Sequence, residues 1–248
     1  MNTRFNIQFK VNPLYVFLHA INMNQDEEPF KGWAKFTNAI WEKNPEIFFF
    51  LAGAAEHVLY VKNTYDYKKL FAKNLQTLAK IQKSKEFKRL VKETEQYNLF
   101  LEKQWNKNKD RVLAILQEIS GLPLPNHTIT INLSHPALRN GMAIDDNNIA
   151  WGHKEEYPNY SIVYICHELL HIMTKHDNSD VLHAVIELLV DNELRIRLNK
   201  KGRYFEHENH WHLKEIEKKL YPAWKQYLKQ DKKNILQFAK KHAKIKRG

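Results

Sequence analysis

The chain of 248 residues contains little cysteine, glycine and proline. Its single cysteine, Cys166, excludes a disulfide within the chain and fits a reducing compartment. Seven glycines and eight prolines are few for an all-β sandwich or barrel, which needs many tight turns. The longest apolar run, at 47–55, is far shorter than the roughly 18 residues of a membrane-spanning helix. Because the N-terminal residues also lack a secretory signal pattern, we expect a cytoplasmic protein without a membrane span.

Basic residues outnumber acidic ones by 39 to 28, which gives a formal net charge of +11 with histidine neutral. Such an excess is compatible with a nucleic-acid partner, with an anionic membrane surface, or simply with solvated helix faces. Hydrophobic residues make up 43% of the chain and aromatic residues 12%, which is enough for a sizeable core. This composition excludes disorder over the whole length and allows one large domain or two small ones.

Before residue 121 the hydrophobic pattern is almost wholly helical. Apolar and polar side chains alternate at 4–11, which predicts one half-buried strand, and the residues at 14–21 predict a short helix. Helical spacing then continues from 30 to 120, with a break at Asn44-Pro45 and a further break expected near 106–108.

A Gly/Pro stretch divides the chain into two regions. Gly121 stands where a helix C-cap belongs, and the Leu-Pro-Leu-Pro that follows cannot continue a helix. We therefore expect a mainly helical N-terminal lobe over 1–120 and a second region over 121–248, in an α+β fold that is predominantly helical. The elements expected in the second region are strands at 127–133 and 148–152, helices at 161–175 and 179–199, a polar loop at 200–212 and helices from 213 to 241.

The first helix of the second region carries His167-Glu168-Leu169-Leu170-His171, which is an H-E-x-x-H motif. Residues four apart share one face of a helix, so both imidazoles can reach the same ion. Glu168 lies beside them, within reach of a water on that ion. The helix is otherwise strongly apolar, and buried charges are costly unless they are paired or bind metal. The alternative is a core helix whose histidines are satisfied by ordinary hydrogen bonds.

The next helix places Glu187 and Asp191 four residues apart on one face. Two like charges at this spacing repel each other, whereas a cation bound nearby would make the pair of carboxylates favourable. A zinc hydrolase site needs three protein ligands and one open position, and Glu187 supplies the third ligand. Asp191 can then accept a hydrogen bond from a liganding imidazole. The alternative is a partly exposed acidic edge.

H-E-x-x-H on one helix followed by E-x-x-x-D on the next resembles the gluzincin branch of the zincin metallopeptidases, which includes the thermolysin-like enzymes. The resemblance covers about 128–199. It implies that Zn²⁺ is bound by His167, His171 and Glu187 and that Glu168 is the general base. Asp191 would not bind the ion itself but would contact one of its ligands.

The resemblance also implies a small sheet beside the active-site helix, whose edge strand pairs with an extended peptide or protein substrate. The strand expected at 148–152 is placed to be that edge strand.

Three other acidic or histidine residues are weighed as ligands. Asp177 stands where the metzincin pattern H-E-x-x-H-x-x-G-x-x-H/D has a ligand, but Thr174 replaces the required glycine. His183 precedes Glu187 by one turn on the same face. It could bind the ion itself or contact one of the residues that bind it. Glu193 falls on another face and is expected at the surface.

Peptide hydrolysis also needs a group that stabilises the oxyanion, often histidine or tyrosine. The polar loop offers His210 and Tyr204 as candidates, and His207 with His210 is a weak candidate for a second metal site. The alternative is a polar loop that merely contains histidines. Cys166 is expected to be an inert core thiol, and a pair of tyrosines, Tyr157 and Tyr160, is expected to pack at the start of the motif helix.

The sequence therefore predicts a zinc-dependent metallopeptidase in which Glu168 activates a water on the ion. The first rival is a non-catalytic basic helical protein that binds nucleic acid or a protein partner. No nucleic-acid motif supports that rival, and the aromatic residues follow helical core spacing. A second rival retains the zincin scaffold only for binding. Glu168 argues against it, because a structural metal site has no need of a base.

Overall fold

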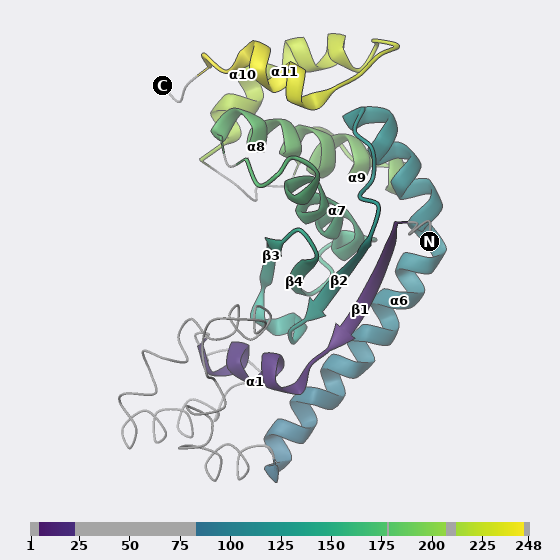
Figure 1. Cartoon of the computed structure of the whole chain (residues 1–248), viewed down its shortest axis with the longest axis vertical. Coiled ribbons are helices and arrows are strands. Elements are labelled where there is room, and N and C mark those ends of the chain that lie inside the picture. Colours follow the sequence, from purple (N-terminus) through teal and green to yellow (C-terminus); the bar gives the residue numbers. More distant parts are fainter. Residues whose placement is uncertain (1–4, 23–82, 178, 207–211, 246–248) are drawn as a thin grey trace.

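The computed structural model describes residues 5–22, 83–177, 179–206 and 212–245 (Figure 1). Over these residues the fold is α+β and predominantly helical, with one small sheet of four strands, as the sequence predicts. The helices expected between 30 and 82, as well as His207 and His210, lie outside the described residues. Among the described helices, none combines the length and the apolar character needed to cross a bilayer.

The sheet has the strand order β1-β2-β4-β3. β1 (Asn6–Val11) pairs in parallel with β2 (Thr128–Leu133), and β2 pairs in parallel with β4 (Asn148–Gly152). β3 (Asn140–Asp145) runs antiparallel to β4 and closes this side of the sheet. The strands expected near 4–11, 127–133 and 148–152 are thus confirmed.

β3 is the strand that the sequence did not predict. Its residues, NGMAID, do not alternate between apolar and polar side chains, and all of them are exposed or half-buried. The prediction that 148–152 forms the edge strand is therefore wrong. β4 is paired on both sides and is buried over four of its five residues, whereas β3 is an edge strand, with no further strand beyond it among the described residues.

α6 (Lys85–Ser120) is one continuous helix of 36 residues, so the break expected near 106–108 is wrong. Ser84 caps its N-terminus, where its hydroxyl accepts a hydrogen bond from the Phe87 amide at 3.1 Å. Asn108 fits within the helix because its side-chain amide donates to the Gln104 carbonyl one turn earlier. Gly121 ends the helix as expected, with a left-handed φ of 65°.

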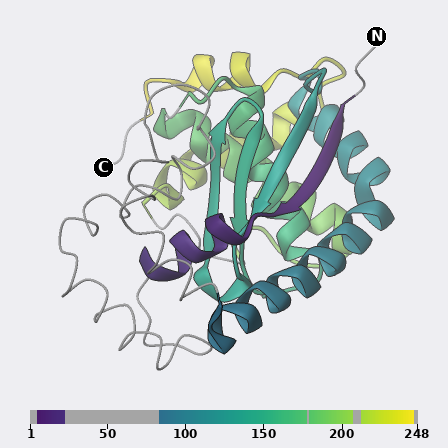
Figure 2. The ribbon, with the colours of Figure 1, turned by 60° about the horizontal axis from the view of Figure 1, so that its bottom comes forward.

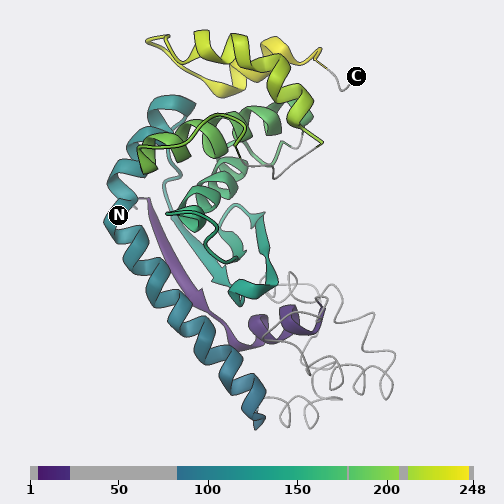
Figure 3. The ribbon, with the colours of Figure 1, turned by 180° about the vertical axis from the view of Figure 1, so that it is seen from behind.

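The remaining elements form layers on the sheet (Figures 1 and 2). α1 (Pro13–Asn22) follows β1, and α6 runs along the β1 side of the molecule (Figure 3). α7 (Tyr160–Met173) packs on β3 and β4, and the chain from 180 to 199 packs on α7. α10 and α11 cover α8 from the far side. The bounds of the other helices are Pro136–Leu138 (a short 3₁₀ turn), Asp180–Glu187 (α8), Arg195–Asn199 (α9), Lys214–Tyr227 (α10) and Ile235–His242 (α11).

One hydrophobic core connects these layers. It extends from Ile7 and Phe9 of β1 through α6 and α7 to Phe238 of α11. β1 and α6 precede the boundary expected after residue 120. β1 nevertheless shares a sheet with the residues that follow it, and both elements share their core.

Two leucines of α6 allow a matched test of this packing. Leu101 is fully buried, whereas the Leu99 side chain is 65% exposed on the same helix. Leu101→Ala is expected to lower the free energy of unfolding by about 2–5 kcal/mol, because it leaves a cavity in the core. Leu99→Ala is expected to change it by less than about 0.5 kcal/mol. Chemical denaturation of both variants measures the difference, and equal effects would mean that α6 does not pack as described.

Candidate metal centre

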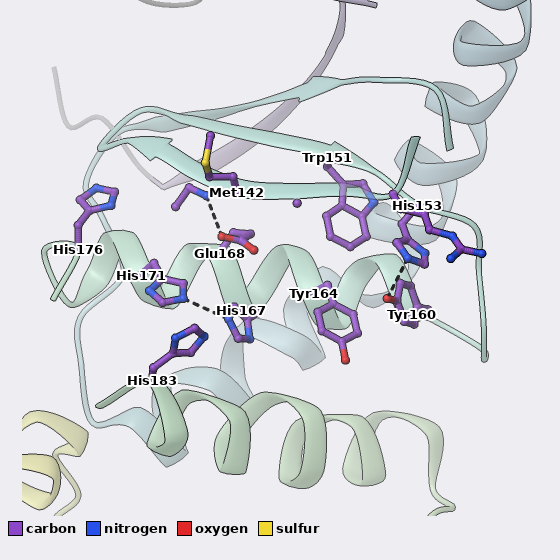
Figure 4. A pocket seen from close by; sticks show the side chains of 13 residues that line it. Met142, Trp151, His153, Tyr160, Tyr164, His167, Glu168, His171, His176 and His183 are labelled. Atoms are coloured by element: carbon purple, nitrogen blue, oxygen red, sulfur yellow. Dashed lines mark hydrogen bonds between the residues drawn. The ribbon is translucent and has the colours of Figure 1, made fainter. Parts of the chain in front are cut away.

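α7 presents its H-E-x-x-H residues to a cavity of about 490 Å³ between the edge of the sheet and α8 (Figure 4). The side chains of His167 and His171 are nearly buried, at 2% and 8% exposure. Their Nε2 atoms lie 3.1 Å apart. The convergence of the two imidazoles expected from the motif is therefore present in the fold.

α8 brings a third imidazole to the same place. His183 lines the cavity and points from α8 toward the pair on α7 (Figure 4). One nitrogen from each of the three rings belongs to a group whose atoms all lie within 4.8 Å of one another. The Nε2 atom of His183 lies 3.6 Å from Oε1 of Glu187, one turn later on α8.

Glu187 and Asp191 lie behind this group and do not line the cavity. Both side chains are buried, and together with His167 they form a second group of ligand-type atoms within 4.8 Å. Oε1 of Glu187 lies 3.8 Å from Nδ1 of His167. Asp191 accepts a hydrogen bond of 2.9 Å from the hydroxyl of Tyr164.

The pKa of Glu187 is raised from 4.5 to about 7, chiefly because burial disfavours its charged form. A hydrogen bond with Asp191 opposes this rise, and the negative charges of Glu217 and Glu168 add to it. Without a cation, this carboxylate is therefore in an environment that favours its neutral form.

A π-helical segment (Leu188–Leu194) between α8 and α9 carries Asp191. The sequence predicted a single α-helix over 179–199. The structure corrects this prediction, because the middle of the stretch forms a wider π-helical turn. The side-chain amide of Asn192 donates to the carbonyl of Glu187, and its Oδ1 accepts from the Phe205 amide. These contacts anchor the segment at Glu187, and π-helical turns often occur at functional sites.

Glu168 faces the other way, toward the sheet (Figure 4). Its Oε2 accepts a hydrogen bond of 2.7 Å from the backbone N–H of Ala143 in β3. The Trp151 carbonyl of β4 is bonded to Ser134 at the end of β2, and Trp151 pairs with Gly141. The backbone polar groups of Gly141 and Ala143 therefore point away from β4, at the outer edge of the sheet.

Aromatic side chains form one wall of the cavity. The ring of Trp151 stacks on that of Tyr164, with centroids 6.1 Å apart and planes 8° apart. A Cβ atom on Gly141 would approach the Trp151 ring to 2.8 Å, so a glycine is needed for this close contact. Tyr160 lies in the first turn of α7 and contacts Tyr157, in agreement with the packing expected for both tyrosines.

The cysteine before the motif is buried as expected. Cys166 is fully inaccessible, and burial raises the pKa of its thiol. A thiol of this kind is protonated at neutral pH and does not act as a nucleophile.

The structure does not bring Tyr204 to the cavity. The prediction that Tyr204 stabilises the oxyanion is therefore withdrawn. Its hydroxyl donates to Glu193 and accepts a hydrogen bond of 3.2 Å from the Trp224 indole. Its ring packs against Tyr221 of α10. The expectation that Glu193 lies at the surface is also wrong, because it is half-buried and pairs with Arg197 at 2.6 Å.

Asp177 lies away from the three histidines, in the loop between α7 and α8. It is exposed, and its carboxylate accepts a hydrogen bond of 2.9 Å from the Ser179 amide. It therefore caps the loop before α8 and does not line the cavity.

Sequence reasoning missed two further residues of the site. Tyr164, three residues before His167 on the same helix face, binds Asp191, and this spacing was visible in the sequence. Ala143 contributes only its backbone N–H, and no side-chain pattern marks such a group.

The donor set fits a zinc ion. Imidazole nitrogens and carboxylate oxygens are the usual zinc donors, and two donor atoms of a tetrahedral site lie about 3.3 Å apart. The separation of 3.1 Å between the two Nε2 atoms on α7 is close to that value. A cation here also offsets the cost of burying the two carboxylates, Glu187 and Asp191.

Comparison with protein-family models, with curated proteins and with solved structures finds no match.

The raised pKa of Glu187 predicts the pH dependence of the metal-free chain. Between pH 4.5 and 7 the unfolded chain binds fewer protons at this carboxyl than the folded chain does, so the free energy of unfolding falls as the pH rises. The full effect is about 3 kcal/mol. Glu187→Gln removes the titration. Denaturation of both chains in EDTA tests this, and a stability difference between them that stays constant over this range would contradict it.

Proposed function

We propose that this chain is a zinc-dependent metallopeptidase. The observation that carries the proposal is the placement of the H-E-x-x-H residues in one cavity. The two histidines converge on one side of α7, and the glutamate between them faces the outer edge of the sheet, where it accepts the Ala143 N–H and where the backbone groups of Gly141 point away from β4. Side chains that can bind a metal, a carboxylate that can act as a base and a strand that can bond an extended peptide therefore line the same cavity, which supports the proposal.

His167 and His171 hold the ion in this proposal, and α8 supplies the third protein ligand. A bound zinc ion supplies Lewis-acid chemistry, which lowers the pKa of water from 15.7 to about 7 and polarises a carbonyl.

Glu168 is the general base. It takes the proton of the attacking water and later passes it to the leaving amine. The hydrogen bond from the Ala143 amide holds its carboxylate on the cavity side of α7, where it is half-buried. The same carboxylate is therefore oriented before substrate arrives, which lowers the cost of positioning it.

β3, not β4, is the strand that pairs with substrate in this proposal. The outward N–H and C=O groups of Gly141 can bond an extended peptide as an added strand. The absence of a side chain at Gly141 leaves the Trp151 ring as the floor beneath that peptide. The substrate class is therefore a peptide or an unfolded protein segment in extended conformation.

A peptide library incubated with the zinc-loaded chain and analysed by mass spectrometry tests the proposal. We expect cleavage products that disappear in EDTA and return when zinc is restored. Cleavage that is insensitive to EDTA, or a zinc-loaded chain that cleaves no peptide in the library, would contradict the proposed function.

A further inference from the structure

We infer that His183 is the third metal ligand and that Glu187 orients two of the liganding imidazoles from behind. This inference rests on the proposed metal site, and it changes the ligand set that the sequence suggests. Two histidines from α7 and one from α8 then hold the ion, while a buried carboxylate fixes their rings.

The two nitrogens of His167 face different groups. Nε2 faces Nε2 of His171 at 3.1 Å, whereas Nδ1 faces Oε1 of Glu187 at 3.8 Å. The lone pairs of the two nitrogens of one imidazole diverge, so an ion held by Nε2 lies on the side of the ring away from Glu187. A carboxylate against the other nitrogen is the usual outer partner of a metal-binding histidine.

His183 stands on the metal side of the same rings. Its ring centroid lies 4.8 Å from that of His171 and 5.3 Å from that of His167. The His183 ring is steeply inclined to both, at 84° and 66°, so the three rings converge without stacking. Figure 4 shows His183 entering the cavity from α8, opposite the two histidines of α7.

Oε1 of Glu187 lies close to both rings that it would orient. It is 3.8 Å from Nδ1 of His167 and 3.6 Å from Nε2 of His183. The remaining nitrogen of His183, Nδ1, is then the one that binds the ion. Three neutral imidazoles leave the charge of the ion uncompensated, and the buried carboxylates of Glu187 and Asp191 supply the compensating charge nearby.

Zinc affinity, measured by competition with a chromogenic chelator, separates the two roles. His183→Ala is expected to weaken zinc binding by more than 100-fold, as the loss of a ligand. Glu187→Gln keeps an acceptor oxygen and is expected to weaken it by less than the roughly 10–100-fold typical of an outer partner. His176→Ala is the matched control, because His176 also lines the cavity but pairs with Asp146, and it is expected to leave zinc affinity unchanged.

X-ray absorption spectroscopy of the zinc-loaded wild-type chain gives a measurement that needs no variant. We expect the scattering pattern of three imidazoles. Two imidazoles and a carboxylate, or a larger loss of affinity in Glu187→Gln than in His183→Ala, would overturn the inference while leaving the metal site intact. A wild-type chain that binds no zinc would instead refute the proposed function itself.

Discussion

Glu168→Gln is expected to lower kcat for peptide hydrolysis by about 10²–10⁴-fold while zinc stays bound. Glutamine has nearly the same shape as glutamate, and its amide oxygen can still accept the hydrogen bond from Ala143. It cannot take a proton from water at neutral pH, however. Because Glu168 faces the sheet while the histidines face α8, the substitution removes the base without removing a ligand.

The measurement is the hydrolysis rate of a peptide identified from the library, with zinc content determined on the same samples. Glu193→Gln is a suitable control, because Glu193 is half-buried like Glu168 but pairs with Arg197 and does not line the cavity. We expect it to retain the wild-type rate. If Glu168→Gln keeps its zinc and hydrolyses peptide within tenfold of wild type, Glu168 is not the base.

His171→Ala is expected to remove the stabilisation that zinc gives to the folded chain. A ligand that binds only the folded state, at 1,000 times its Kd, raises the free energy of unfolding by about 4 kcal/mol. For a chain of this size that corresponds to a rise in Tm of roughly 8–16 °C. Because His171 is one of the two α7 donors, its loss should abolish most of this rise.

The quantity to compare is the change in Tm between zinc and EDTA, not Tm itself. His171 is buried, so the alanine variant is expected to be less stable even without metal. His176→Ala again serves as the control, since its imidazole is partly exposed at the cavity and pairs with Asp146. An equal rise in Tm with zinc in wild type and His171→Ala would exclude His171 from the metal site.

Local patterns were enough to predict several of the elements that carry the candidate site. Alternation identified β1 and β2, and the apolar spacing around the H-E-x-x-H motif identified α7. Those signals are strong because each of these elements buries one face or more in the core.

β3 was missed for the corresponding reason. It is a short, largely polar edge strand whose pairing with β4 depends on backbone hydrogen bonds and not on buried side chains. The resemblance therefore implied an edge strand beside the active-site helix, but that role was assigned to 148–152 and the strand at 140–145 was not recognised.

The arrangement of the side chains at the candidate metal site could be predicted only in part. Spacing placed His167 with His171, and Glu187 with His183, on shared helix faces. It could not decide which α8 side chain faces the cavity, because that depends on how α8 is rotated against α7. The π-helical turn also alters the direction of Asp191, and helical periodicity carries no sign of it.

Tyr204 shows the limit of reasoning from residue type. A tyrosine in a histidine-rich loop was a chemically sensible partner for an oxyanion, but its position depends on tertiary packing. The ring lies against Tyr221 of α10, and the hydroxyl binds Glu193. No local pattern around residue 204 indicates either contact.

The most direct test of a metal site on α7 is elemental analysis of the chain after incubation with zinc and removal of the excess. Wild type and Glu168→Gln are expected to hold one zinc per chain, and His167→Ala is expected to hold none. Wild type without zinc, or His167→Ala with as much zinc as wild type, would contradict the metal centre and with it the proposed peptidase.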